Sequence, residues 1–182
     1  MIKKTLFFLF EISKIVIVAF LIVAPIRYFL FQPFVVRGSS MEPNFYSGDY
    51  LIIDEISYRF EKPERGEVIV FKYPQDPSQR FIKRIIGLPG ETIEMNNGKI
   101  TIIGSDGKTQ ALDESIYLPP QNSATERVVK LGSDEYFVMG DNRDFSSDSR
   151  AWGSLPQKNI IGKVFLRVFP FTAFAKIEAP AY

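Results

Sequence analysis

The chain has 182 residues, no histidine and no cysteine, and its formal net charge at pH 7 is +1. The two missing residue types exclude a Ser-His-Asp triad, a Cys-His dyad, disulfide bonds and the usual zinc sites, and the small net charge gives no case for nucleic-acid binding. A hydrolytic enzyme of this composition has to move protons with a lysine or a carboxylate. The length suits one domain with a hydrophobic core and a small appendage.

Residues 5–34 are much more apolar than the rest and favour a single membrane-anchoring helix. The uncharged run over 15–26 has 12 residues, fewer than the roughly 20 that span a bilayer, but apolar residues continue on both sides of it. Lys14 and Arg27 can snorkel toward opposite interfaces. A cleaved signal peptide and a buried soluble helix are the alternatives, and the length of the apolar stretch speaks against the first.

Positive residues before this run, Lys3, Lys4 and Lys14, indicate a cytoplasmic N-terminus. We therefore expect a cytoplasmic stub and anchor over 1–34. Residues 35–182 then form a domain on the outer face of the membrane.

After residue 34 the chain changes to short segments rich in Val, Ile, Tyr and Phe, separated by Gly, Pro, Asn and Asp. A hairpin over 91–103 is indicated by Asn96-Asn97-Gly98, a strong turn signal. The residue types at 104–110 are typical of a turn region. Those at 111–127 are typical of a loop or accessory excursion. No helical pattern of useful length follows residue 36, so the predicted fold is mainly antiparallel β, as folded sheets or an open barrel. The other expected strands cover 49–53, 67–73, 79–86, 135–139 and 161–169.

Ser40 and Lys83 are candidates for a hydrolytic pair. A serine hydroxyl needs a base, and lysine is a base only when burial lowers its pKa by several units from about 10.4. Alternation along the strand puts Lys83 on one face with Phe81 and Ile85, and Arg84 on the other. The alternative is that both cations are solvated at a strand edge and that Ser40 lies in an ordinary loop.

A dense polar segment, Gly140 to Arg150, follows an apolar strand and contains three aspartates, two arginines and three serines. Such a segment suits a self-satisfied hydrogen-bond network, a solvated turn or an oxygen-ligand cation site. An EF-hand loop is excluded because the spacing is wrong and no glutamate closes it.

Several blocks, in this order, closely resemble bacterial type I signal peptidases, the Ser/Lys dyad serine proteases. Together they cover most of residues 8–168, and an ordered set of blocks is far more specific than any one motif. The matching blocks are Gly38–Pro43, Ser47–Ile52, Arg65–Phe71, Phe81–Glu91 and Gly140–Arg150, with Trp152-Gly153 following.

The resemblance implies that Ser40 is the nucleophile, Lys83 the general base, and Ser146 the serine that orients the lysine amine. It implies a β-sheet catalytic core with a smaller β extension at about residues 92–133. Asp148 and Arg150 match a pair that braces the site. The other matching supporting residues are Gly38, Asp141, Asn142, Arg143 and Asp144.

Two positions depart from the pattern that the family usually shows. Many Gram-negative members carry a hydroxyl for the oxyanion hole where this chain has Gly38, so the backbone N–H of Ser40 would have to stabilise the oxyanion. Asn44-Phe45 replaces the usual Thr-Leu and would reshape a substrate pocket. The expected pocket walls are Val36, Met41, Phe45, Phe81 and Ile82.

The activity implied is removal of N-terminal signal peptides from exported precursor proteins by a monomeric, single-pass enzyme of the bacterial cell (inner) membrane. Its expected partners are signal peptides and the lipid bilayer, without nucleic acid, metal or cofactor. A soluble, self-cleaving Ser/Lys peptidase of the repressor type is the runner-up, and the apolar N-terminus argues against it. A tethered peptide-binding module without catalysis and a nucleotide or metal enzyme are further alternatives; the last lacks a phosphate loop or ligand cluster.

Overall fold

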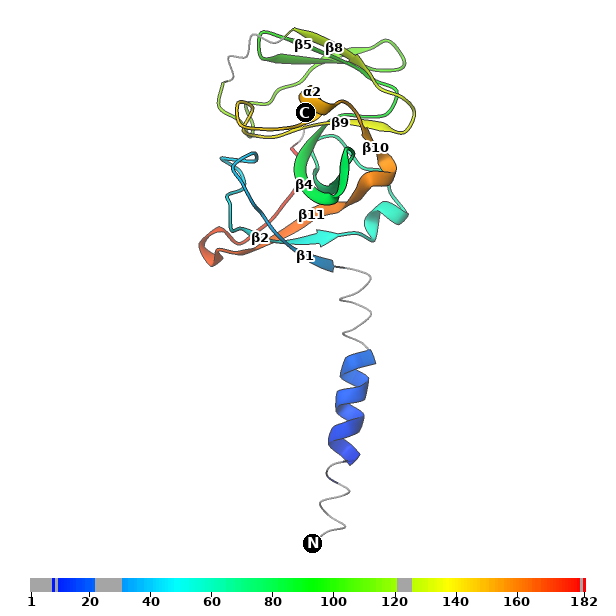
Figure 1. The fold of residues 1–182 in the computed structure, drawn as a ribbon, viewed down its shortest axis with the longest axis vertical. Coiled ribbons are helices and arrows are strands. Elements are labelled where there is room, and N and C mark those ends of the chain that lie inside the picture. The colour runs from blue at the N-terminus through cyan, green and yellow to red at the C-terminus, as the bar shows by residue number, and fades with distance from the viewer. Residues whose placement is uncertain (1–7, 9, 22–30, 121–125, 181) are drawn as a thin grey trace.

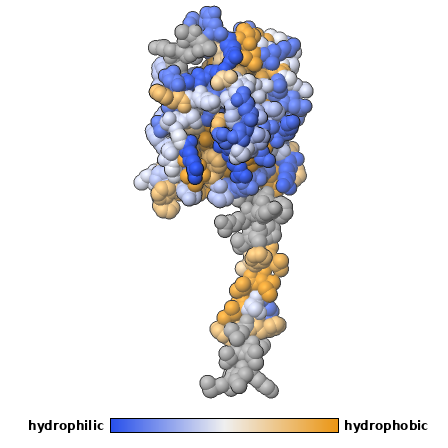
Figure 2. Space-filling model, in the orientation of Figure 1, coloured by the Kyte–Doolittle hydropathy of each residue, from blue (hydrophilic) through white to orange (hydrophobic). Residues whose placement is uncertain are grey.

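The computed structural model describes residues 8, 10–21, 31–120, 126–180 and 182. Residues 10–21 form a helix that lies apart from a body of β-strands (Figure 1). Apolar side chains cover this helix, whereas polar side chains dominate the visible face of the body (Figure 2). Within the described ranges, no helix has the length and apolar character needed to span a bilayer. Most of the expected anchor lies outside the described residues.

The larger sheet has eight strands in the order β1-β2-β11-β3-β4-β9-β10, with β12 paired to β11. All of its strand pairs are antiparallel. Its strands are β1 (Phe31–Val35), β2 (Tyr50–Asp54), β3 (Val68–Tyr73), β4 (Asp76–Gly87), β9 (Glu135–Met139), β10 (Leu155–Pro156), β11 (Ile160–Phe169) and β12 (Ala175–Lys176).

The smaller sheet has four strands in the order β7-β6-β5-β8. The β5–β6 hairpin turns at Asn97 and Gly98, whose φ angles of 48° and 77° are the positive values that a two-residue hairpin turn favours. A shared hydrophobic core, which includes Ile86 and Phe137 from the large sheet and Ile93 and Ile102 from the small one, joins the two sheets. The strands are β5 (Thr92–Asn96), β6 (Lys99–Ile103), β7 (Thr109–Ala111) and β8 (Arg127–Lys130).

Helical structure in the described part of the body is short, which agrees with the lack of a helical pattern after residue 36. It consists of α2 (Ser149–Trp152) and the 3₁₀ turns η1 (Ser57–Arg59), η2 (Gln157–Asn159) and η3 (Phe171–Ala173).

The expected end of the anchor at residue 34 was wrong. Residues 31–34 belong to β1, which pairs with β2 from Phe31↔Asp54 to Val35↔Tyr50. Hydropathy alone does not separate the end of an apolar helix from an apolar edge strand whose Phe34 side chain packs against the core. Pro33 fits an edge strand because it needs no ladder partner for a backbone N–H.

Candidate active site

Ser40 lies in a tight turn between β1 and β2. Gly38 has a φ of +85°, a conformation that glycine adopts without strain. The turn closes through a hydrogen bond from the backbone N–H of Phe45 to the Met41 carbonyl at 2.9 Å. Asn142 holds it from the other side, because its backbone N–H donates to the Ser40 carbonyl at 3.0 Å. The nucleophile candidate is therefore fixed by its own turn and by the polar loop that follows β9.

Lys83 lies on β4 with only 4% of its surface exposed. Its Nζ donates to Ser40 Oγ at 2.8 Å and to the Ile82 carbonyl at 2.8 Å, and it lies 5.5 Å from the centre of the Phe81 ring. Burial lowers the pKa of Lys83 to about 8, while the negative charges of Asp148 and Asp141 oppose this shift. The structure thus brings Ser40 and Lys83 into contact, with the amine desolvated rather than solvated at a strand edge.

Asp148 and Arg150 form an ion pair beneath the site. Asp148 is fully buried, and both of its carboxylate oxygens accept hydrogen bonds from the Arg150 guanidinium at 2.9 Å. The backbone N–H of Gly140 donates to the same carboxylate at 3.0 Å. Burial raises the pKa of Asp148, but the contacts with Arg150 and Gly140 outweigh burial and lower it overall. The pair ties the two ends of the polar loop together.

A second buried ion pair joins the polar loop to β4. Arg84 Nε and Nη2 donate to the two oxygens of Asp141 at 2.9 and 2.7 Å, and Asn44 Nδ2 donates to Asp141 Oδ2 at 2.9 Å. One carboxylate therefore connects the residue after Lys83 to the turn that contains Ser40.

Arg143 extends this network to a residue that the sequence analysis did not single out. Its Nη1 donates to Glu114 at 2.7 Å, and its Nε donates to the Gly140 carbonyl at 3.0 Å. Glu114 lies in the excursion between β7 and β8, and nothing in its local sequence indicates a partner so far along the chain.

Asp144, the next residue of the polar loop, is exposed. The polar loop is a hydrogen-bond network, and the described residues contain no acidic cluster suited to a metal ion.

The orienting role that the resemblance implies for Ser146 stays a prediction. Its hydroxyl is buried but makes no hydrogen bond with the Lys83 amine, which donates to Ser40 Oγ and to the Ile82 carbonyl. Space around Ser146 is tight: a side chain at Gly140 would collide with the Ser146 hydroxyl and with the Ser40 carbonyl. Close approach of the three segments thus requires glycine at this position.

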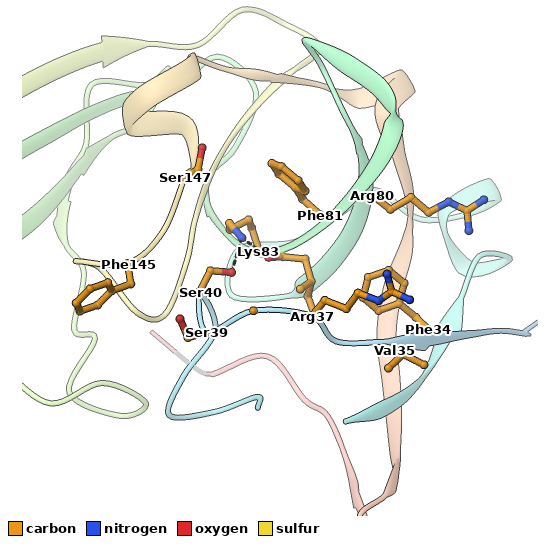
Figure 3. Close-up of a pocket in the computed structure, with 12 residues that line it drawn as sticks. Phe34, Val35, Arg37, Ser39, Ser40, Arg80, Phe81, Lys83, Phe145 and Ser147 are labelled. Atoms are coloured by element: carbon orange, nitrogen blue, oxygen red, sulfur yellow. Dashed lines mark hydrogen bonds between the residues drawn. The ribbon is translucent and has the colours of Figure 1, made fainter. Parts of the chain in front are cut away.

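A cavity of about 460 Å³ opens beside Ser40 and Lys83 (Figure 3). Of the five expected wall residues, Phe81 and Ile82 line it. Val36, Met41 and Phe45 are 2% exposed or less, pack in the core and are not among the residues that line this cavity, so their place in a substrate pocket stays a prediction. The neighbours of Val36, Val35 and Arg37, line the cavity. Lining residues that were not expected as walls are Phe34, Val35, Arg37, Ser39, Arg80, Phe145 and Ser147.

The chain is similar to signal peptidases both in its match to a family model and in its similarity to individual proteins. The model of the family described as signal peptidase, peptidase S26, matches residues 9–169. A probable signal peptidase I-1 of Synechocystis sp. is 39% identical over 93% of this chain and 87% of its own length. A signal peptidase I of Leptolyngbya laminosa is 38% identical over 85% of this chain and 77% of its own length.

Among solved structures, a signal peptidase I from Enterococcus faecalis is 30% identical and aligns with 57% of this chain and 97% of that chain, with a TM-score of 0.46. Because the family model matches most of the sequence and the relatives are similar over most of their length, the chain belongs to the signal peptidase family, peptidase S26, and is a serine endopeptidase.

Proposed function

We propose that this chain is a membrane-bound endopeptidase that removes N-terminal signal peptides from exported precursors, with Ser40 as nucleophile and Lys83 as general base. The observation that carries the proposal is the 2.8 Å contact between Lys83 Nζ and Ser40 Oγ, made by a lysine whose surface is only 4% exposed. A desolvated amine loses its proton more readily and can then accept one from the serine.

In the proposed reaction, Ser40 Oγ attacks the scissile carbonyl while its proton passes to the neutral Lys83 amine. The C–N bond then breaks, and Lys83 returns the proton to the leaving amine. Water hydrolyses the acyl ester and frees Ser40. The backbone N–H of Ser40 makes no hydrogen bond among the described residues, so it is free to donate to the oxyanion.

Substrate would bind as an extended strand between two open sheet edges. Within the described structure, β1 pairs only with β2, and β4 before Arg84 pairs only with β3. Both open edges border the cavity, through Phe34 and Val35 on β1 and through Arg80 to Lys83 on β4. A peptide added there gains backbone hydrogen bonds and places alternate side chains into the cavity. Small cavity-facing side chains in the precursor would fit best beside Phe81 and Ile82.

The proposal includes an N-terminal membrane anchor with its start in the cytoplasm and the β body on the outer face of the cell membrane, where the enzyme acts as a monomer. Exposed apolar side chains on the described helix support it: Ile15 is 68% exposed and Phe20 is 69% exposed. In water such a surface is unfavourable, whereas in lipid it is favourable.

The direct test is incubation of the detergent-solubilised protein with a model precursor, followed by N-terminal sequencing of the product. We expect one new N-terminus, immediately after a small-x-small sequence. A protein that leaves the precursor intact, or cuts it at scattered sites, would contradict the proposal.

The lowered pKa of Lys83 predicts how activity changes with pH. Below pH 8 the amine is mostly the ammonium form and cannot accept the serine proton, so kcat/KM should rise with pH through a midpoint near the Lys83 pKa of about 8 and then level off. At pH 7 roughly one-tenth of the enzyme would carry the neutral amine. Initial rates with a peptide substrate at low concentration measure this profile. A midpoint near the unperturbed lysine value of about 10.4 would argue against a buried base.

A further inference from the structure

Two arginines, Arg37 and Arg80, line the same cavity as Ser40 and Lys83. Both are exposed to solvent. Figure 3 shows them on the side of the Ser40–Lys83 pair where β1 lies, whereas Phe145 lies on the opposite side. Among the described residues, no Asp or Glu lines this cavity. The cavity therefore carries two permanent positive charges even when the Lys83 amine is neutral.

Neither arginine is neutralised by an ion pair in the described part of the chain. Arg80 makes only a long hydrogen bond, from Nη1 to Gln32 Oε1 at 3.5 Å. Burial raises the pKa of Glu55, and the positive charge of Arg80 partly opposes this rise. The Arg80 and Glu55 side chains nevertheless form no ion pair. Arg59 and Arg127 also form no ion pair among the described residues, but neither lines this cavity. The other five described arginines of the body are bound to carboxylates: Arg65, Arg84, Arg143, Arg150 and Arg167.

We propose that Arg37 and Arg80 form a subsite that selects precursors with an acidic side chain among the residues that precede the cleaved bond. The two guanidinium groups offer planar, always charged donors of the kind that bind carboxylates in pairs of hydrogen bonds. A substrate carboxylate would supply the negative charge that the cavity wall lacks. The subsite explains why unpaired arginines stand in the cavity of a peptidase whose reacting groups need no cation.

The position of the subsite relative to the cleaved bond rests on the proposed function. β1 lies at the end of the body that is nearest to the N-terminal helix (Figure 1). A precursor whose apolar segment is embedded in the same membrane enters the cavity from the β1 side. Residues before the cut then pass Arg37 and Arg80, and residues after it pass Phe145.

A lipid phosphate has similar chemistry, but the structure favours the substrate. Both arginines line the cavity of the reacting pair rather than a surface outside it. A carboxylate on a peptide bound beside Ser40 is held within reach of them throughout the reaction, whereas a headgroup would have to enter the space that the peptide occupies.

The test compares matched peptide substrates that carry Glu or Gln at single positions before the cut. We expect the ratio of kcat/KM for Glu over Gln to exceed one at one or two positions. Arg37→Gln and Arg80→Gln should each lower this ratio about two- to fivefold, as expected for partly exposed charge pairs, and high salt should lower it in the wild type. Lys99→Gln removes the same charge from an exposed site on β6 and should leave the ratio unchanged. An equal ratio in the wild type and in the double arginine variant would overturn the proposal.

A binding measurement separates failure of the subsite from failure of the proposed function. In the Ser40→Ala background, fluorescence anisotropy should show tighter binding of the Glu peptide than of the Gln peptide, and the difference should disappear when both arginines are replaced by glutamine. Equal binding of the two peptides would overturn the subsite, whether or not the wild type cleaves precursors. Vesicles with and without phosphatidylglycerol complete the test. If the arginine variants lose only vesicle binding and keep the peptide selectivity, the arginines contact lipid and the proposal is wrong.

Discussion

Replacing either member of the Ser40–Lys83 pair should abolish precursor cleavage while leaving the fold intact. Ser40→Ala removes the atom that forms the acyl bond, and Lys83→Met removes the only amine in contact with that atom among the described residues. From the behaviour of other serine peptidases, we expect kcat to fall by about 10⁴-fold or more. Lys83→Arg should be equally inactive, because a guanidinium does not give up its proton at usable pH. Precursor cleavage followed by gel electrophoresis and mass spectrometry measures the loss.

Stability distinguishes a catalytic role from a structural one. Lys83→Met exchanges a desolvated amine for an apolar side chain of similar length, so the free energy of unfolding should stay the same or increase. Lys72→Met is the matched control, because Lys72 is exposed on the neighbouring strand β3, and it should cleave like the wild type. Residual cleavage by Lys83→Met above about one-hundredth of the wild-type rate would remove lysine from the proposed mechanism.

Local pattern was sufficient to predict the β architecture because alternation and turn residues act over a few positions. The hairpin of β5 and β6 follows from Asn97-Gly98, and the range of β9 agrees with the expected 135–139. β1 could not be identified in this way, since its apolar residues continue those of the preceding segment. Its strand conformation depends on pairing with β2, which hydropathy does not encode.

Burial of two adjacent cations is the part of the site that alternation alone does not predict. One of Lys83 and Arg84 was expected on each face of β4, yet both are 4% exposed. Arg84 can be buried because Asp141, 57 residues later in the chain, neutralises it. Such a partner is invisible to local periodicity, and the resemblance to signal peptidases supplied the pairing of Ser40 with Lys83 that spacing did not.

The walls of the cavity are a second part of the site that the sequence alone predicts incompletely. Residues close to Ser40 in sequence were expected to surround it, but the turn after Gly38 directs Met41 and Phe45 into the core. Phe145, which is distant from Ser40 in the sequence and has an exposed side chain, also lines the cavity. Arg37, Gly38 and Ser39 do line the cavity, so sequence proximity to the nucleophile predicts only part of the wall. The side chains of Met41 and Phe45, which follow Ser40 in the chain, are packed in the core instead.

Asp141→Ala should be among the most destabilising single substitutions in the body. It leaves Arg84, which is only 4% exposed, without its carboxylate, and it takes away one of the two acceptors of Asn44. Removing one partner of a buried ion pair typically costs about 3–5 kcal/mol, because the remaining charge stays desolvated. Urea denaturation should show this loss as a lower midpoint with an unchanged slope. Cleavage should fall as well, since Asp141 connects the turn of Ser40 to the strand of Lys83.

A double variant tests whether the cost arises from the unpaired charge. Arg84→Met combined with Asp141→Leu removes both charges and keeps the volume, so it should be more stable than Asp141→Ala alone. Lys108→Ala breaks an exposed ion pair with Asp106 and keeps the backbone hydrogen bond that Asp106 accepts, so it should cause no measurable change. If the double variant is as unstable as Asp141→Ala, the hydrogen bond from Asn44 and the shape of the loop stabilise this region, rather than the neutralisation of Arg84. In that case the buried Arg84 of the wild type would be stabilised by its other two contacts rather than by Asp141. Arg84 donates a hydrogen bond to the Gly66 carbonyl at 2.9 Å, and its guanidinium carbon lies 4.2 Å from the centre of the Tyr117 ring.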